Sequence, residues 1–81
     1  MTNWDYEVIG GRKHLGYEFT FEISKREVPG MRVDRSLELA DGYIELPEAT
    51  LLRYFGESGW ELVAVRPDND RMSWILKRPA K

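Results

Sequence analysis

The side chains best suited to chemistry in this chain begin with its single histidine, His14, which stands beside Arg12 and Lys13 in a glycine-rich stretch. A catalytic histidine needs an orienting carboxylate and a nucleophile or substrate within hydrogen-bond reach. The local spacing supplies neither. As a zinc ligand His14 would stand alone, because the chain has no cysteine and zinc takes three or four protein ligands. We therefore expect a solvated loop histidine with no catalytic or metal-binding role.

Carboxylates are numerous, and a pair of them about 5 Å or about 6.5–9.5 Å apart in a cleft can hydrolyse glycosides. The main candidates are Asp5, Glu7, Glu18, Glu22, Glu38, Asp41, Glu45 and Glu61. Several alternate with apolar residues, which is typical of the solvated face of a sheet. Residues 68–70, Asp-Asn-Asp, resemble the start of a calcium loop, but its glycine and its twelfth-position glutamate are missing. The sequence therefore predicts no enzyme, no catalytic residue, no metal and no cofactor. An enzyme with a carboxylate pair would require a concave pocket that holds two of the acids.

Basic residues provide the second class of candidate site. A phosphate loop must lead into a helix whose N-terminus faces the anion, whereas the Gly-Gly-Arg-Lys run at 10–13 leads into a strand-like pattern. A weaker hypothesis is a nucleic-acid or anionic-ligand binder that uses residues 10–16 and 25–35. Its candidate anion-binding residues are Arg12, Lys13, Lys25 and Arg26. The net charge of −2 argues against nucleic acid, whose binders usually carry a basic excess.

Two alternating runs near the N-terminus predict the first elements that must position these residues. Residues 4–9 alternate aromatic or aliphatic residues with acids, and residues 17–23 place Tyr17, Phe19, Phe21 and Ile23 on one face. Three glycines in residues 10–16 indicate a mobile loop between them. The expected structure is an antiparallel hairpin.

The middle of the chain is less regular. Residues 24–35 indicate an irregular solvated connection with a turn at Pro29-Gly30. Residues 36–39 and 43–46 could form a short hairpin around Asp41-Gly42. A helix is predicted over 47–58, because proline suits the first helical position and Leu51, Leu52 and Phe55 form an apolar stripe.

The end of this helix is the best specified feature of the sequence. If Gly59 follows the helix in the left-handed conformation, Phe55 and Trp60 occupy the two positions that touch in a Schellman motif. We therefore predict a positive φ at Gly59, and a fold-specifying corner made of Phe55, Gly59 and Trp60.

The remaining residues predict a second hairpin. Residues 60–65 are almost continuously apolar and indicate a central strand, 67–70 a turn, 72–77 the returning strand and 78–81 a frayed basic tail. The sequence thus predicts one domain over residues 1–81. Its class is α+β, with an antiparallel sheet of about four strands (β-β-loop-α-β-β) and one helix on one face.

Residues 51–65 read LLRYFGESGWELVAV, and this run resembles the LLxxxGxxGWELVxV signature of the domain of unknown function 4177 family. The C-terminal strand ending in Leu76-Lys77-Arg78-Pro79 and the opening run at 4–9 are also similar to that family. Residues 10–40 depart from it. The resemblance covers about half of the chain and implies a small bacterial or phage α+β protein, with no activity attached.

Apolar residues on both faces of the C-terminal hairpin suggest how the protein works. Strands that are apolar on both faces need cover on both, and one helix covers only one. The second face is then covered by residues 24–46 or by another copy of the chain. We expect a non-enzymatic interaction module that forms a homodimer or small oligomer, with a candidate interface of Phe19, Phe21, Met72 and Trp74. An unidentified protein partner is the alternative to self-association. The N-terminus shows no secretory pattern and no apolar run approaches membrane-spanning length, so a cytoplasmic protein is expected.

Overall fold

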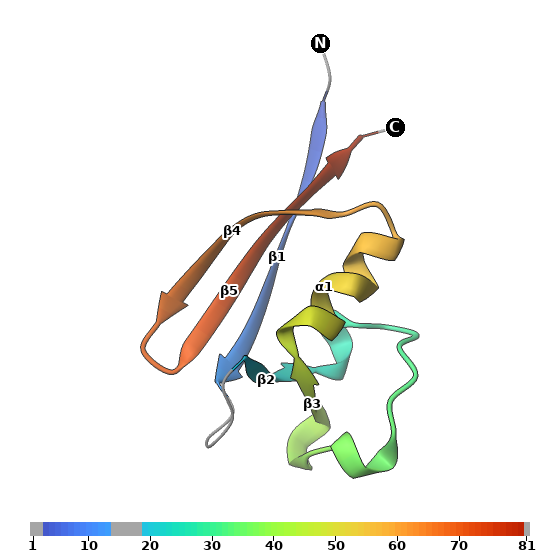
Figure 1. The fold of residues 1–81 in the computed structure, drawn as a ribbon, viewed down its shortest axis with the longest axis vertical. Helices are drawn as coiled ribbons and strands as arrows, with labels where there is room; N and C mark the ends of the chain where they lie inside the picture. The colour runs from blue at the N-terminus through green and yellow to red at the C-terminus, as the bar shows by residue number, and fades with distance from the viewer. Residues whose placement is uncertain (1–2, 14–18, 81) are drawn as a thin grey trace.

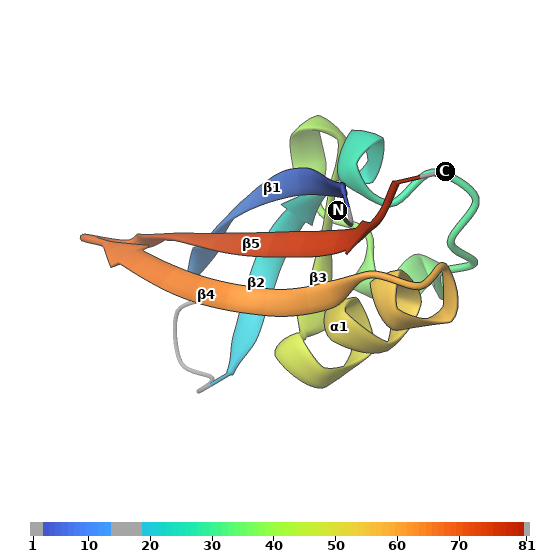
Figure 2. The same ribbon diagram turned by 90° about the horizontal axis from the view of Figure 1, so that it is seen from above.

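Antiparallel strands form one five-stranded sheet in the order β3-β2-β1-β5-β4, with a helix packed across one face (Figures 1 and 2). This is a computed structural model, which describes residues 3–13 and 19–80. The strands are β1 (Trp4–Lys13), β2 (Thr20–Ser24), β3 (Tyr43–Pro47), β4 (Glu61–Asp68) and β5 (Arg71–Pro79), and the helix is α1 (Glu48–Glu57). Three short 3₁₀ turns span Lys25–Glu27, Arg35–Leu37 and Ala40–Gly42. The predicted α+β class is confirmed, with five strands in place of about four.

The first strand runs further than predicted. β1 continues through Gly10 and Gly11 to Lys13, where the sequence indicated a loop. Gly11 is needed here for space, because a Cβ on it would lie 2.5 Å from Ile23 Cδ1 and 3.0 Å from the Trp74 ring. His14 and Tyr17 lie outside the described residues.

The strand added to the predicted four is β3, which comes from the short hairpin predicted over residues 36–46. Its second arm is β3, which pairs with β2 from Thr20↔Pro47 to Ser24↔Tyr43. Its first arm is a 3₁₀ turn followed by a single bridge, Glu38↔Ile44. β3 forms because Ile44 and Leu46 are both buried in the core.

The helix boundaries are close to those predicted. Pro47 is the N-cap and not the first helical residue. At the other end Gly59 has φ +88°, as predicted. Trp60 N–H donates to the Phe55 carbonyl at 3.1 Å and Gly59 N–H to that of Gly56 at 2.9 Å, the two bonds of a Schellman motif.

The C-terminal hairpin corrects two predictions. β4 is an edge strand and not a central one, and it is bulged between Leu62 and Ala64. The tail is ordered up to Ala80 and not frayed there, because Pro79 pairs with Trp4 and Ala80 N–H donates to the Asn3 carbonyl at 2.9 Å. The apolar run at residues 60–65 predicted a buried central strand, but Leu62 and Val63 of β4 are exposed.

The core lies between the sheet and α1, around Trp74. Its buried residues are Ile9, Phe21, Ile23, Val28, Ile44, Leu46, Leu51, Phe55, Trp74 and Leu76. The 28–33 segment joins this core through Val28, Met31 and Val33. The Tyr54 hydroxyl, from α1, donates to the Pro29 carbonyl and holds the segment in place.

Candidate functional site: the open face of the sheet

The face of the sheet turned away from α1 is called the open face here, and the strand register divides it into rows. Residues directly opposite one another on neighbouring strands share a face. A row is therefore the set of such partners followed from strand to strand across the sheet. Since Ile9 and Gly11 point into the core, the even-numbered residues 4–12 of β1 lie on the open face. Their partners on β5 are the odd-numbered residues 71–79.

One row is charged on all five strands. From β4 to β3 it contains Asp68, Arg71, Arg12, Glu22 and Glu45. Two cations stand side by side at its centre, with an acid at one end and two at the other. Like charges directly opposite one another are destabilising, and the row holds two such pairs, Arg12–Arg71 and Glu22–Glu45.

Arg12 is held in place on one side. Its guanidinium carbon lies 4.2 Å from the centre of the Tyr43 ring, and its Nη2 lies 3.4 Å from Glu22 Oε1. Its Nε is buried, and no acceptor from the described part of the chain lies within hydrogen-bond distance of it. One donor of this arginine is therefore fixed and unused.

A hollow of about 210 Å³ lies beside the charged row. Gly10 leaves it open, because nothing lies within 4 Å of the position where a Cβ would stand. The hollow is lined by Gly10, Gly11, Arg12, Ser24, Glu27, Tyr43, Arg71, Met72 and Ser73. It thus combines two guanidinium groups, two serine hydroxyls, one phenol and one carboxylate.

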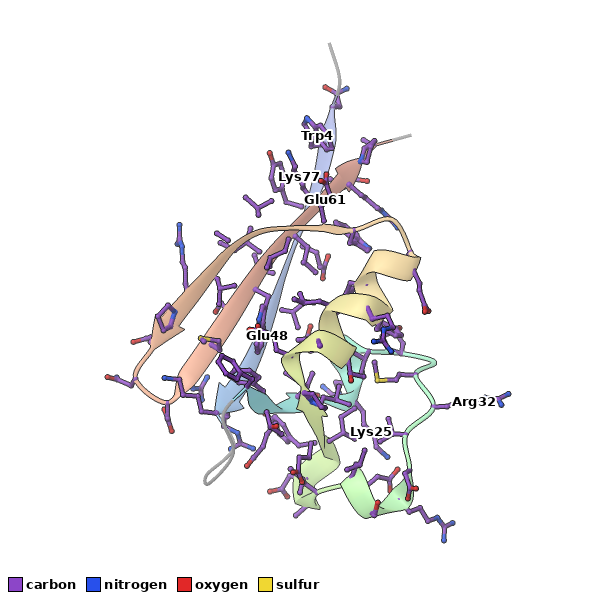
Figure 3. All side chains as sticks on the ribbon, in the orientation of Figure 1. Trp4, Lys25, Arg32, Glu48, Glu61 and Lys77 are labelled. Atoms are coloured by element: carbon purple, nitrogen blue, oxygen red, sulfur yellow. The ribbon has the colours of Figure 1, made fainter. Side chains whose placement is uncertain are left out.

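Further along the same face lies a group of apolar residues, called the apolar patch here. It consists of Trp4, Tyr6, Val8, Ala64 and Ile75. Tyr6 is 61% exposed and Val8 59% exposed. Lys77 and Glu61 are direct partners in the Tyr6 row, and Lys77 Nζ lies 4.2 Å from the Trp4 ring centre. Figure 3 shows Trp4, Lys77 and Glu61 together at the end of the sheet that extends beyond α1.

The interface residues chosen from the sequence do not gather on this face. Trp74 and Phe21 are buried inside the chain, where their rings meet edge to face at 4.9 Å. Met72 is half-buried against the same core. Phe19 is 71% exposed but precedes β2 with φ +59°, apart from the predicted stripe. Burial thus removes Phe21 and Trp74 from the candidate interface, and the large exposed apolar residues of the open face are Trp4, Tyr6 and Val8 of the first strand.

The four candidate anion-binding residues do not lie together, and only one of them lines the hollow. Arg12 lines the hollow, whereas Lys13, at the end of β1, does not; its N–H donates to the Asp70 carbonyl at 2.7 Å. Lys25 bonds to Glu38 at 2.7 Å, and Arg26 is exposed on the 3₁₀ turn after β2. The sequence missed Arg71, which only strand register brings opposite Arg12.

Two exposed carboxylates have a depressed pKa. The hydrogen bond and the charge of Lys25 lower the pKa of Glu38. The backbone N–H and then the hydroxyl of Ser36 lower the pKa of Asp34. Both groups lie in the connection between β2 and β3, away from the hollow and the apolar patch.

Metal sites and membrane-spanning helices were also sought in the described residues. Within residues 3–13 and 19–80, no three or more histidine, cysteine, aspartate or glutamate side chains are grouped so as to hold a metal. Nor does that part of the chain contain a helix long and apolar enough to cross a membrane. Comparisons with models of protein families, with curated proteins and with solved structures found no match to this chain.

Proposed function

We propose that this chain is a non-enzymatic interaction module that self-associates through the apolar patch. The observation that carries the proposal is the exposure of Tyr6 and Val8 on β1, which is the central strand of the sheet. Contiguous apolar surface on a soluble domain typically marks an interaction site. Residues 24–46 were the alternative cover, but their 28–33 segment packs against the core, and Tyr6 and Val8 stay exposed.

A second copy of the chain is the proposed occupant because the patch carries its own complementary charges. Lys77 and Glu61 stand side by side in the row that contains Tyr6. A two-fold axis through the patch would place Glu61 of one copy against Lys77 of the other, with the apolar residues between the two sheets. Such a self-complementary contact is the commonest arrangement in homodimers.

A matched pair of substitutions tests this face. Val8→Lys places a charge in the middle of the patch, whereas Leu62→Lys places the same charge on the helix side of the same sheet, where Leu62 is 42% exposed opposite Leu76. Light scattering behind a sizing column should give twice the 9.5 kDa chain mass for the unchanged protein. We expect Val8→Lys to run as a monomer and Leu62→Lys as a dimer.

Two outcomes would reject the proposal. A strict monomer at every concentration would exclude self-association, and a dimer broken by Leu62→Lys but not by Val8→Lys would move the interface to the other face. Circular dichroism of both variants separates loss of association from loss of fold.

Nucleic-acid binding, the second hypothesis from the sequence, has no comparable support. Two of its four cations, Arg12 and Lys25, are engaged by Glu22 and Glu38. A fluorescence-anisotropy titration with single-stranded oligonucleotides at low salt tests it directly. Membership of the domain of unknown function 4177 family and a cytoplasmic location stay as proposals, the first supported by the Gly59–Trp60 corner.

A further inference from the structure

The geometry points to the hollow beside Arg12 and Arg71 as a binding site for a small oxyanion, a molecule that carries a carboxylate or a phosphate group. This inference does not rest on the self-association proposed above, because the hollow and the apolar patch share no residue.

Arg12 supplies the first reason. Its ring contact with Tyr43 and its ion pair with Glu22 fix the plane of the guanidinium. Its Nε is buried, but 42% of the side chain is exposed, so the outer N–H groups of the guanidinium are the ones open to a ligand. Guanidinium groups bind carboxylate and phosphate through neighbouring N–H donors in one plane. A guanidinium whose plane is already fixed loses little freedom when an anion binds to its exposed N–H groups.

Arg71 supplies the second reason. It stands directly opposite Arg12 on β5, so two positive charges share one edge of the hollow. Asp68 and Glu22 flank this pair within the row, and neither of them lines the hollow. An anion between the two guanidinium groups would offset their mutual repulsion, which otherwise acts against the fold.

The rest of the lining narrows the class of ligand. Ser24 and Ser73 contribute hydroxyl groups that can donate to an anionic oxygen, and Gly10 leaves room for it. Glu27 adds one carboxylate to the same lining. A volume of about 210 Å³ is below the usual range of about 300–1,000 Å³ for drug-sized ligands. The site thus suits a small metabolite-sized anion and not a polymer.

Nuclear magnetic resonance titration of the full chain tests the site residue by residue. Inorganic phosphate and acetate are the two probes, each added at constant ionic strength maintained with potassium chloride. We expect saturable shifts of the Arg12 Nε–H signal and of the Gly10 and Ser73 amides. Saturation by both probes identifies a general oxyanion site, and saturation by one alone identifies the preferred group.

Three substitutions make the test specific. Arg71→Gln should weaken binding by about tenfold or more, the usual effect of losing one charge-assisted hydrogen bond. Arg66→Gln removes the same charge from the same face outside the hollow, opposite Ser73, and should change the affinity little. Glu27→Gln should strengthen binding, because it removes a negative charge from the lining.

The inference is overturned if neither probe gives saturable shifts at these three signals. It is equally overturned if Arg71→Gln and Arg66→Gln weaken the response to the same extent, because general screening of positive charge would then explain the shifts. Unchanged amide signals in the core, such as that of Ile44, show that each variant is folded.

Discussion

The indole N–H of Trp74 donates to a carboxylate oxygen of Glu48 at 3.0 Å. Trp74 is the largest fully buried side chain of the described residues, and Glu48 is the first residue of α1. This bond joins the centre of β5 to the start of the helix. It also satisfies the one polar atom that the tryptophan brings into the core.

Loss of the acceptor should therefore destabilise the fold. Glu48→Ala leaves the indole N–H buried without a partner, and we expect the free energy of unfolding to fall by about 1–3 kcal/mol. Glu48→Gln keeps a side-chain oxygen and should lose less. Urea denaturation measures both, and equal losses would show that the hydrogen bond contributes nothing beyond the charge at the helix start.

Neighbouring glycines of β1 should respond in opposite directions to the same substitution. Gly11→Ala places a methyl group 2.5 Å from Ile23 Cδ1 and 3.2 Å from the Glu22 carbonyl oxygen, and overpacking of this kind costs about 1–3 kcal/mol. Gly10→Ala meets nothing within 4 Å and should be neutral or stabilise by about 0.5–1 kcal/mol. Thermal unfolding of the two variants checks the contrast, and similar melting temperatures would contradict the close packing at Gly11.

The helix end offers a second matched pair. Gly59 has φ +88°, so Gly59→Ala should cost about 1–2 kcal/mol of stability through backbone strain alone. Gly56 lies inside α1 with open space around it, and Gly56→Ala should stabilise by about 0.5–1 kcal/mol. Denaturant unfolding that gives both variants the same sign of change would contradict the Schellman ending.

The two lowered carboxyl pKa values predict separable responses to acid. Lys25→Met should raise the pKa of Glu38 toward its ordinary value of 4.5 and leave that of Asp34 unchanged. Ser36→Ala should raise the pKa of Asp34 only in part, because the backbone N–H of residue 36 still donates to it. Carbon-13 titration of the carboxyl groups measures both.

The sign of the stability change follows from the direction of these shifts. A carboxyl with a lowered pKa in the folded chain stabilises it above the unfolded-state pKa, and that contribution disappears as the pH falls through the folded-state value. Each substitution should therefore reduce stability near neutral pH more than it does in strong acid. An equal loss at both pH values would contradict the assigned partners.

Local patterns in the sequence predicted the features that depend on neighbours along the chain. The conformation of Gly59 follows from the helix that precedes it and the tryptophan that follows it. The pairing of the two C-terminal strands follows from the turn-forming residues between them. By contrast, residues 43–46 were predicted to pair with 36–39, whereas β3 pairs with β2 because β2 and the core accept Ile44 and Leu46.

The candidate site depended on information that the sequence does not contain. Period-two alternation shows that Trp74 and Met72 share a face, but it does not show which face α1 covers. Trp74 was therefore chosen for an interface although it lies on the face that α1 covers. Tyr6 and Val8, on the open face, were predicted only as part of the first strand. Arg71 was missed for the same reason, since its neighbour Arg12 lies 59 positions earlier in the chain and the two meet only through the β1–β5 register.

The β1–β5 register also decides how the domain would respond to force. Trp4 pairs with Pro79, and the Ala80 N–H meets the Asn3 carbonyl, so the first and last described residues lie on adjacent antiparallel strands at the same end of the sheet. A pull applied to these two ends loads the interstrand hydrogen bonds one after another, like opening a zipper. Strands pulled from opposite ends would instead share the load across the whole ladder at once. The domain should thus unravel at low tension from its ends inward, and the Arg12–Arg71 pair should be the last of this ladder to part.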